Sequence, residues 1–526
     1  MPSILSLFII LVLGIEVSVI DGFLVGTKFV SKYAPTTKLT VTSEGDTRKA
    51  GHSPKHVVIV GGGIGGLSTA FDARHILHKD DKITVVSDRP HFEFTPSNPW
   101  VAIHKRTPQE IRLNLEAILP HHNIDFVHAK ATRLDTEENL LTVESDTGDG
   151  NQKLQYDYLV IATGPRLAFE EIPGLNELRL ENHDLLHDEN VVASICETDH
   201  AMHAAQAIDR LIQNPGPIVV GAVQGASCFG PLYEYALLLK YYLQKKGSAA
   251  LQEQCPISVV TSEPYIGHLG LQGAGQSQEI LTKLLQKNDI DWYTNCKVSE
   301  VNKDGLKIEF HEEEQMETSD SPNMMTGIKT KFLPSKLTML IPPFRGLKLW
   351  QQTPGLTDDK GMILVDQHQQ SISYPNIFGV GVCVHLDPVE KTLIPTGPPK
   401  TGYMIESMGT ACVRNIRALM DESDSLQAGR SATAEHTRPS FHVPILNGLC
   451  ITDFGDEGAI FLTLPQMPPR RTDLTIEGKI GTMAKMAFEK YFLFKIQTGD
   501  TDPYYEKYLL HLIGVDRVER EKIEKK

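Results

Sequence analysis

The stretch Lys55-His-Val-Val-Ile-Val-Gly-Gly-Gly-Ile-Gly-Gly-Leu67 decides the fold of this chain. The residues up to Val60 form a β-branched run that is typical of a buried strand. Gly61, Gly63 and Gly66 follow with Gly-x-Gly-x-x-Gly spacing, and a helical pattern begins at Leu67. Glycines between a strand and a helix let backbone N–H groups approach a pyrophosphate at the helix N-terminus. The stretch therefore predicts a dinucleotide-binding βαβ unit.

Residues at three later strand ends are predicted to complete this site. Ser87 and Asp88 follow the predicted strand Ile83 to Val86, where such sites hold a ribose. Thr163-Gly164 ends the apolar run that starts at Tyr158, and Gly381 lies at the end of a late strand that starts at Asn376. The last two strand ends resemble signatures of flavoproteins with two dinucleotide-binding domains. This resemblance favours FAD over NAD at the first site.

A second βαβ unit is predicted from a strand at Pro217 to Gly221, a helix near Leu232 and a strand at Ile257 to Thr261. Its turn has Val223 where a pyrophosphate needs a glycine, which disfavours a nicotinamide cofactor. Glu263, after the last strand, could still hold a ribose. We interpret this unit as a scaffold. The predicted fold class is α/β, with two Rossmann-like dinucleotide-binding domains and a C-terminal membrane-docking segment.

Composition and charge restrict the function. With 526 residues, of which 41% are hydrophobic, the chain is long enough for two or three globular domains. The formal net charge of −15 repels phosphates, which argues against nucleic acid as a partner. The seven cysteines include no Cys-x-x-Cys pair, so neither a disulfide framework nor a metal site is expected.

The first fifty residues differ from the rest of the chain. An apolar run from Ile4 to Gly14 has the length of a signal-peptide core, and a basic, hydroxyl-rich stretch follows from Phe23 to Ser53. This arrangement resembles the bipartite plastid presequences of algae with complex plastids; secretion and mitochondrial import are the alternatives. The predicted division is a presequence at 1–54, a first FAD-binding part at 55–195, a second Rossmann-like domain at 196–335, a second FAD-binding part at 336–425 and a C-terminal quinone and membrane region at 440–526.

Longer stretches of the chain resemble bacterial type I sulfide:quinone oxidoreductases. The resemblance covers about residues 55 to 514. It implies an FAD enzyme that oxidises sulfide and passes the electrons to a membrane quinone. The runs that carry it include Phe94-Thr-Pro-Ser-Asn-Pro-Trp100, Ser194-Ile-Cys-Glu-Thr-Asp-His200, Gly225-Ala-Ser-Cys-Phe-Gly-Pro231, Thr396-Gly-Pro-Pro-Lys-Thr-Gly-Tyr-Met-Ile-Glu-Ser407 and Ala487-Phe-Glu-Lys-Tyr-Phe492.

The resemblance implies that Cys196 and Cys383 are the catalytic cysteines. Sulfide has to attack an electrophilic sulfur and release a thiolate, so the chemistry needs such a pair. The family often has a third cysteine upstream, but no cysteine precedes Cys196 here. The other cysteines, including Cys228 in the turn of the second unit, are expected to be small buried side chains.

Further candidates surround this pair. Those for proton transfer are Asp199, His200, Glu234 and His268. By family analogy, Lys400 and Thr401 begin a helix directed at the flavin, where a positive helix end would stabilise negative charge. The candidates for the apolar walls of a quinone site are Phe344 and Phe461.

The C-terminal run Ile480 to Ile496 combines aromatic residues with Lys485, Lys490 and Lys495. We interpret it as a helix on a membrane surface, and the alternative is a helix packed on the core. A homo-oligomer is possible. The rival functions are a type II NAD(P)H:quinone dehydrogenase, a flavocytochrome-type sulfide dehydrogenase and a flavoprotein that only binds partners.

Overall fold

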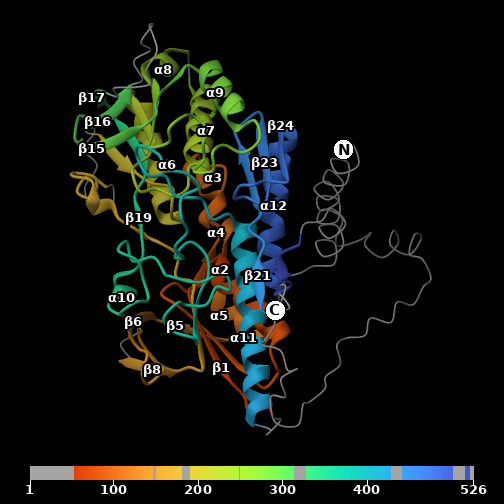
Figure 1. The fold of residues 1–526 in the computed structure, drawn as a ribbon. Helices are drawn as coiled ribbons and strands as arrows, with labels where there is room; N and C mark the ends of the chain where they lie inside the picture. Colours follow the sequence, from red (N-terminus) through yellow and green to blue (C-terminus); the bar gives the residue numbers. More distant parts are fainter. Residues whose placement is uncertain are drawn as a thin grey trace, which may run out of the picture.

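A computed structural model describes most of the chain beyond the predicted presequence (Figure 1). The described residues are 52–145, 150–179, 190–247, 249–312, 327–427, 441–501 and 516–521. The predicted presequence, apart from its last residues, therefore lies outside them. In Figure 1 the first Rossmann-like unit occupies the lower half and the second the upper half, with α11 and α12 beside them.

The first unit is a parallel five-stranded sheet with the order β20-β9-β1-β2-β5. Its strands are β1 (His56–Val60), β2 (Lys82–Ser87), β5 (Asp125–His128), β9 (Tyr158–Ile161) and β20 (Ile377–Gly379). Helix α2 (Ile64–Ile76) follows the glycine turn and packs against α11 (Gly402–Gln427). The predicted strand, glycine turn and helix are confirmed.

The second unit is another parallel five-stranded sheet, with the order β11-β18-β12-β13-β14. Its strands are β11 (Val191–Ala193), β12 (Ile218–Ala222), β13 (Ile257–Thr261), β14 (Ile290–Tyr293) and β18 (Leu337–Ile341), and its longer helices are α6 (Thr198–Gln213), α7 (Gly230–Lys246) and α9 (Ser277–Lys287). Because β11 and β18 both pair in this sheet, the unit begins before the predicted residue 196 and ends after the predicted residue 335. One continuous cluster of buried apolar side chains joins both sheets.

Smaller antiparallel sheets extend the two units. They are formed by β6 (Lys130–Asp135), β7 (Leu140–Glu144) and β8 (Asn151–Gln155), by β15 (Cys296–Asn302), β16 (Gly305–Glu312) and β17 (Gly327–Pro334), and by β22 (Gly448–Asp453), β23 (Gly458–Leu464) and β24 (Thr472–Gly478). Three two-stranded pairs are β3 (His91–Glu93) with β4 (Arg112–Asn114), β10 (Arg166–Leu167) with β19 (Phe344–Arg345), and β21 (His442–Pro444) with β25 (Val518–Arg520). The short helices are α3 (Asn98–Ala102), α4 (Pro108–Ile111), α5 (Leu115–Ile118), α8 (Ala249–Gln254), α10 (Lys348–Gln351) and the 3₁₀ turns η2 (Thr95–Ser97), η3 (Leu119–His122) and η4 (Phe169–Glu171).

Helix α12 (Lys479–Thr498) packs against β22 and β23 and carries buried charges. Lys485 pairs with Glu234 of α7, and the Lys495 Nζ atom lies 2.6 Å from a carboxylate oxygen of Glu406 on α11. Both lysines are only 2% exposed. The expectation that the lysines of this helix lie at a membrane surface is therefore wrong for these two, because each neutralises a buried carboxylate. In the described part of the chain, no helix combines the length and the apolar character needed to cross a bilayer.

Candidate active site

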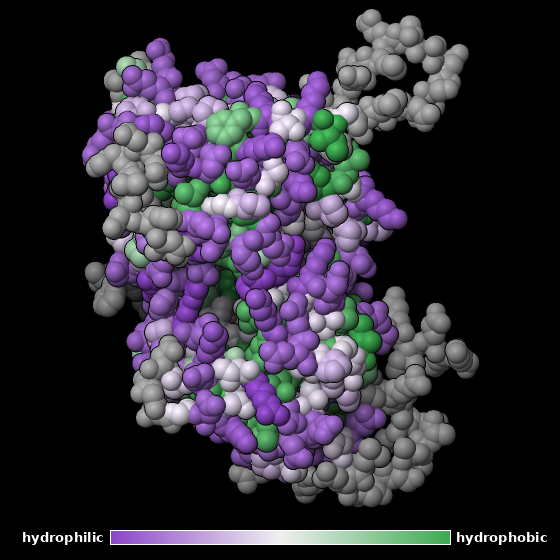
Figure 2. All heavy atoms as spheres, turned by 90° about the vertical axis from the view of Figure 1, so that its left-hand side faces the viewer, coloured by the Kyte–Doolittle hydropathy of each residue, from purple (hydrophilic) through white to green (hydrophobic). Residues whose placement is uncertain are grey.

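A cavity of about 1120 Å³ lies between the two units, at the carboxyl ends of the parallel strands. This edge is where open α/β sheets bind their ligands. Figure 2 shows one side of the molecule, which is hollowed between its upper and lower halves, with hydrophobic residues inside the hollow. The cavity is bordered by the glycine turn after β1, the strand ends of β2 and β9, the start of α11, the turns before α6 and α7, strands β22 and β23, and α12.

The glycine turn at one end of the cavity has the geometry of a pyrophosphate cradle. Gly61 has a φ of +129°, which favours glycine, and its N–H group donates to the Val86 carbonyl oxygen at 2.8 Å. A side chain at Gly66 would collide with the carbonyl group of Gly61, whereas a Cβ at Gly63 would meet no atom within 4 Å. Gly63 therefore leaves open the space at the N-terminus of α2. Ser87 and Asp88, the ribose candidates, also line the cavity.

The start of α11 borders the same cavity and supplies unsatisfied polar groups. The Thr401 Oγ1 atom is buried and has no hydrogen-bond partner among the described residues. Burial lowers the pKa of Lys400 to about 8, although Cys383 and Asp358 act in the opposite direction. Thr163, Gly164 and Gly381 line the cavity near these groups. Two helix N-termini, an orphaned hydroxyl and an ammonium group border one cavity, and this set of groups fits an FAD: the glycine turn before α2 would hold its pyrophosphate, and Lys400 and Thr401 would face its flavin.

Cys196, directly before α6, lines the cavity and is half-buried. Burial raises the pKa of its thiol to about 12; Glu197 adds to this shift, while a hydrogen bond from Ser194 and the charge of Arg179 oppose it. Arg179 donates to the His200 Nε2 atom at 2.7 Å, so this ring nitrogen acts as an acceptor. Sequence reasoning missed Arg179 because nothing in its local pattern indicates a contact with α6.

Cys383 is only 1% exposed and does not itself line the cavity. Its thiol contacts the carbonyl oxygens of Ile161 and Val380, at 3.4 Å each. Burial raises its pKa, and hydrogen bonds from Gly164 and Thr163 and the charge of Lys400 oppose the shift. Because these three groups are themselves in the lining, Cys383 lies directly behind it. The two predicted cysteines are thus near the same cavity, but only Cys196 borders it.

Two cysteines that sequence reasoning left aside also border the cavity, namely Cys228 and Cys450. Cys228 lies between β12 and α7, at the carboxyl end of a strand. Ligands of α/β sheets bind at the carboxyl ends of the strands, so this position could have indicated a site residue. The expectation of a small buried side chain did not take it into account. Cys255, Cys296 and Cys412 are fully buried and do not line the cavity.

The four candidates for proton transfer separate into two groups. His200 and Glu234 line the cavity. Glu234 is buried, which raises its pKa in spite of the opposing charge of Lys485. Asp199 is instead exposed and lies 2.5 Å from Arg112, and the buried His268 Nε2 atom lies 2.7 Å from Glu390. Neither Asp199 nor His268 lines the cavity, so the geometry favours His200 and Glu234.

The apolar part of the lining contains both predicted quinone residues, Phe344 of β19 and Phe461 of β23. Phe488 and Phe492 of α12 also line the cavity, and their rings lie 6.0 Å and 5.4 Å from that of Phe94. Both α12 residues belong to the run Ile480 to Ile496, for which the sequence leaves open a membrane surface or packing on the core.

Two residues of the second unit do not suit a dinucleotide of the usual kind. Val223 is 1% exposed and belongs to a buried apolar cluster. Glu263 is fully buried and accepts hydrogen bonds from Tyr233 at 2.6 Å, Thr261 at 2.7 Å and the Leu269 N–H group at 2.6 Å. A carboxylate bound in this way cannot also hold a ribose, which supports the interpretation of this unit as a scaffold.

The sequence matches the model of the pyridine nucleotide-disulphide oxidoreductase family over residues 55–401. A sulfide-quinone reductase of Aquifex aeolicus is 37% identical over 460 residues, which cover 87% of this chain and 95% of that protein. The X-ray structure of the sulfide:quinone oxidoreductase of the same bacterium matches with a TM-score of 0.76 over 90% of this chain and 98% of that one. The mitochondrial sulfide:quinone oxidoreductase of Mus musculus is 23% identical over 64% of this chain and 67% of that protein.

Proposed function

This chain belongs to the sulfide:quinone oxidoreductase family of the pyridine nucleotide-disulphide oxidoreductases, and on that basis we propose that sulfide is oxidised in the cavity that Cys196 borders. The protein is an FAD-dependent oxidoreductase that oxidises sulfide and delivers the electrons to a quinone. One observation supports the location: the pyrophosphate cradle and a half-buried thiol border the same cavity. FAD, when bound there, accepts two electrons and passes them on to the quinone.

A relay between Cys196 and Cys383 would receive the sulfur. In this proposal HS⁻ attacks the Cys196 sulfur of a disulfide between the two cysteines. The bond between the cysteines breaks, a persulfide forms on Cys196, and Cys383 leaves as a thiolate. Lys400 and the hydrogen-bond donors at Thr163 and Gly164 favour that thiolate. The burial of Cys383 keeps water away from it.

The test is anaerobic mixing of the FAD-loaded protein with sulfide, followed through the flavin absorbance. Cys196→Ser and Cys383→Ser should each reduce the rate of bleaching to background, because the relay needs both sulfur atoms. Cys412→Ala is the matched control, since Cys412 is buried in α11 away from the cavity lining. Bleaching at the wild-type rate in either serine variant would rule out the relay.

The rival function, a type II NAD(P)H:quinone dehydrogenase, is tested in the same assay by replacing sulfide with NADH. The burial of Val223 and the internal hydrogen bonds of Glu263 predict no bleaching. Rapid bleaching of the flavin by NADH would instead support a dehydrogenase that binds NADH in the second unit.

We also propose that the protein associates peripherally with a membrane, from which the quinone enters. Ile480 and Phe494, at the two ends of α12, are 37% and 53% exposed. The Phe494→Asp variant should lose binding to quinone-containing vesicles in co-sedimentation while still being bleached by sulfide. Unchanged vesicle binding would place the contact elsewhere, for example in residues 502–515, which lie outside the described part of the chain.

The proposed location is a plastid, on the sequence pattern of residues 1–54 alone. A fluorescent protein fused behind residues 1–54 should accumulate in plastids when it is expressed in an alga with complex plastids. Accumulation in mitochondria or secretion would contradict this proposal. A homo-oligomer stays a prediction, which the sedimentation velocity of the purified protein tests.

A further inference from the structure

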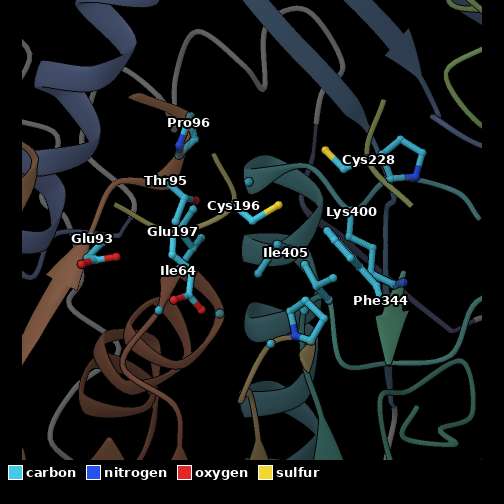
Figure 3. A pocket seen from close by; sticks show the side chains of 18 of the residues that line it. Ile64, Glu93, Thr95, Pro96, Cys196, Glu197, Cys228, Phe344, Lys400 and Ile405 are labelled. Atoms are coloured by element: carbon cyan, nitrogen blue, oxygen red, sulfur yellow. The ribbon is translucent and has the colours of Figure 1, made fainter. Parts of the chain in front are cut away.

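Three thiols share the active-site cavity: Cys196 before α6, Cys228 before α7 and Cys450 on β22. Figure 3 shows the side chains of Cys196 and Cys228 in the same pocket, with the Cys196 sulfur pointing toward Cys228. The Cys450 sulfur lies over the first turn of α7, 3.4 Å from the position that a Cβ atom of Gly230 would take. Gly230 is only two positions beyond Cys228 in the sequence. The three sulfur atoms therefore surround one part of the cavity.

The electrostatics of these thiols agree with this arrangement. Burial is the main reason that the pKa of Cys228 is raised to about 12, and the neighbouring Cys450, Cys196 and Glu234 act in the same direction. Burial also raises the pKa of Cys450 to about 12, with Glu234 adding to the shift and Lys485 opposing it. Both groups are therefore neutral thiols near pH 7. Neutral thiols are poor metal ligands and poor nucleophiles toward dissolved molecules, so a reaction requires an electrophilic sulfur held beside them.

We propose that Cys228 and Cys450 form an acceptor site for sulfane sulfur, which removes the oxidised sulfur atom from Cys196. This proposal rests on the proposed function, which supplies the persulfide on Cys196. It gives the cavity a place to hold product sulfur while the Cys196 and Cys383 pair is regenerated.

The transfer changes no oxidation state overall. The Cys228 sulfur attacks the outer sulfur of the Cys196 persulfide, and a new S–S bond forms at Cys228. The S–S bond at Cys196 breaks, and the proton of the Cys228 thiol passes to the departing Cys196 sulfur. Cys450 takes the sulfur atom from Cys228 in a second exchange of the same kind. Cys196 and Cys383 can then form their disulfide again, with the two electrons passing to FAD and the quinone of the enzyme's own reaction.

The position of Cys383 explains why a separate acceptor is useful. Cys383 is buried behind the cavity lining, so a growing sulfur chain has no space on that side. On the other side Cys228 and Cys450 adjoin the wall that includes Phe461, and Cys450 is the strand partner of Phe461 in β22 and β23. Sulfane sulfur is soft and polarisable, so an apolar wall suits it better than the polar cradle at the FAD end.

The experiment locates sulfur atoms on peptides of the full-length, FAD-loaded protein. The protein is mixed anaerobically with isotopically labelled sulfide and a soluble quinone, alkylated with a reagent that preserves persulfides, digested with trypsin and analysed by mass spectrometry. Arg210 separates Cys196 from Cys228, and Lys240 ends the peptide of Cys228, so the two cysteines are resolved. We expect the added sulfur on Cys196, Cys228 and Cys450 in the wild-type protein. In Cys196→Ser the sulfur should disappear from all three, and in Cys228→Ala it should disappear from Cys450 but persist on Cys196.

Cys255→Ala is the matched control, because Cys255 belongs to the same Rossmann-like unit as Cys228 but does not line the cavity. Its labelling pattern should equal that of the wild type. Added sulfur confined to Cys196, or a plain disulfide between Cys228 and Cys450 without label, would overturn the acceptor site while leaving the proposed function in place. Wild-type protein whose flavin is not bleached by sulfide would instead contradict the proposed function itself.

Discussion

Replacing Glu263 by Gln should make the folded protein less sensitive to alkaline pH. Glu263 is fully buried in the second unit, and burial raises the pKa of its carboxyl group from 4.5 to about 7, although three hydrogen bonds oppose the shift. One pKa unit corresponds to about 1.4 kcal/mol. The ionised carboxylate therefore costs the folded state roughly 3 kcal/mol, while the unfolded chain ionises it without that cost.

The sign of the pH dependence follows from this difference. Below pH 4.5 the carboxyl group is protonated in both states, and no stability is lost. Between pH 4.5 and about pH 7 the folded protein retains a proton that the unfolded chain has released, so this group's contribution to stability falls as the pH rises. Above about pH 7 the loss is complete. Glutamine has no such titration and can keep an acceptor toward the Leu269 N–H group.

The assay is urea unfolding of wild type and Glu263→Gln at several pH values between 5 and 9, followed through tryptophan fluorescence. The free energy of unfolding of the variant, relative to the wild type, should rise by roughly 3 kcal/mol from pH 5 to pH 8.5. Comparison at each pH cancels the other titrating groups. A difference that stays constant over this range would refute the reasoning, because it would mean that Glu263 ionises equally easily in both states.

Four further variants, at three places, test other parts of the structure. Gly63→Ala should weaken FAD binding but leave the apoprotein stable, because the added Cβ meets no protein atom. Gly66→Ala should also destabilise the apoprotein, because its Cβ would clash with Gly61. Equal melting temperatures for the two apoproteins would contradict this prediction. Lys485→Met leaves Glu234 buried without its cation, so the free energy of unfolding should fall by about 3–5 kcal/mol at pH 7. The loss should be smaller at pH 5, where the carboxyl group of Glu234 takes up a proton more easily. A loss below about 1 kcal/mol at pH 7 would contradict this prediction. If the relay is correct, the rate of flavin bleaching by sulfide should fall above about pH 8, because Lys400 loses its proton there. The Lys400→Arg variant should keep a high bleaching rate to higher pH, because arginine stays protonated. Identical pH profiles of the two proteins would exclude a role for the charge of Lys400.

The sequence was sufficient to predict those parts of the molecule that depend on residues close together in the chain. The run up to Val60, the glycine turn and the following helix are contiguous, so their spacing predicts the βαβ unit and a dinucleotide as its ligand. The same holds for Val223, whose side chain alone is enough to disfavour a pyrophosphate.

Contacts between distant residues could not be predicted in this way. Cys450 approaches the start of α7, two residues after Cys228, because β22 borders the cavity, and the two cysteines are far apart in the sequence. The lysines of α12 have an amphipathic pattern that fits a lipid surface as well as a buried carboxylate. Only the fold decides between these, since Glu234 lies 251 positions before Lys485 and Glu406 lies 89 positions before Lys495.

The pairing of α12 with both units also determines when the protein can finish folding. At about 5–20 residues per second, a ribosome needs roughly 13–50 s to proceed from Glu234 to Lys485. During that interval Glu234 of α7 has no cationic partner, because Lys485 has not yet been synthesised. The Rossmann-like units can form their sheets early, but the wall that α12 gives to the cavity has to be added late. A nascent chain therefore remains without a closed reaction chamber until synthesis has passed this helix.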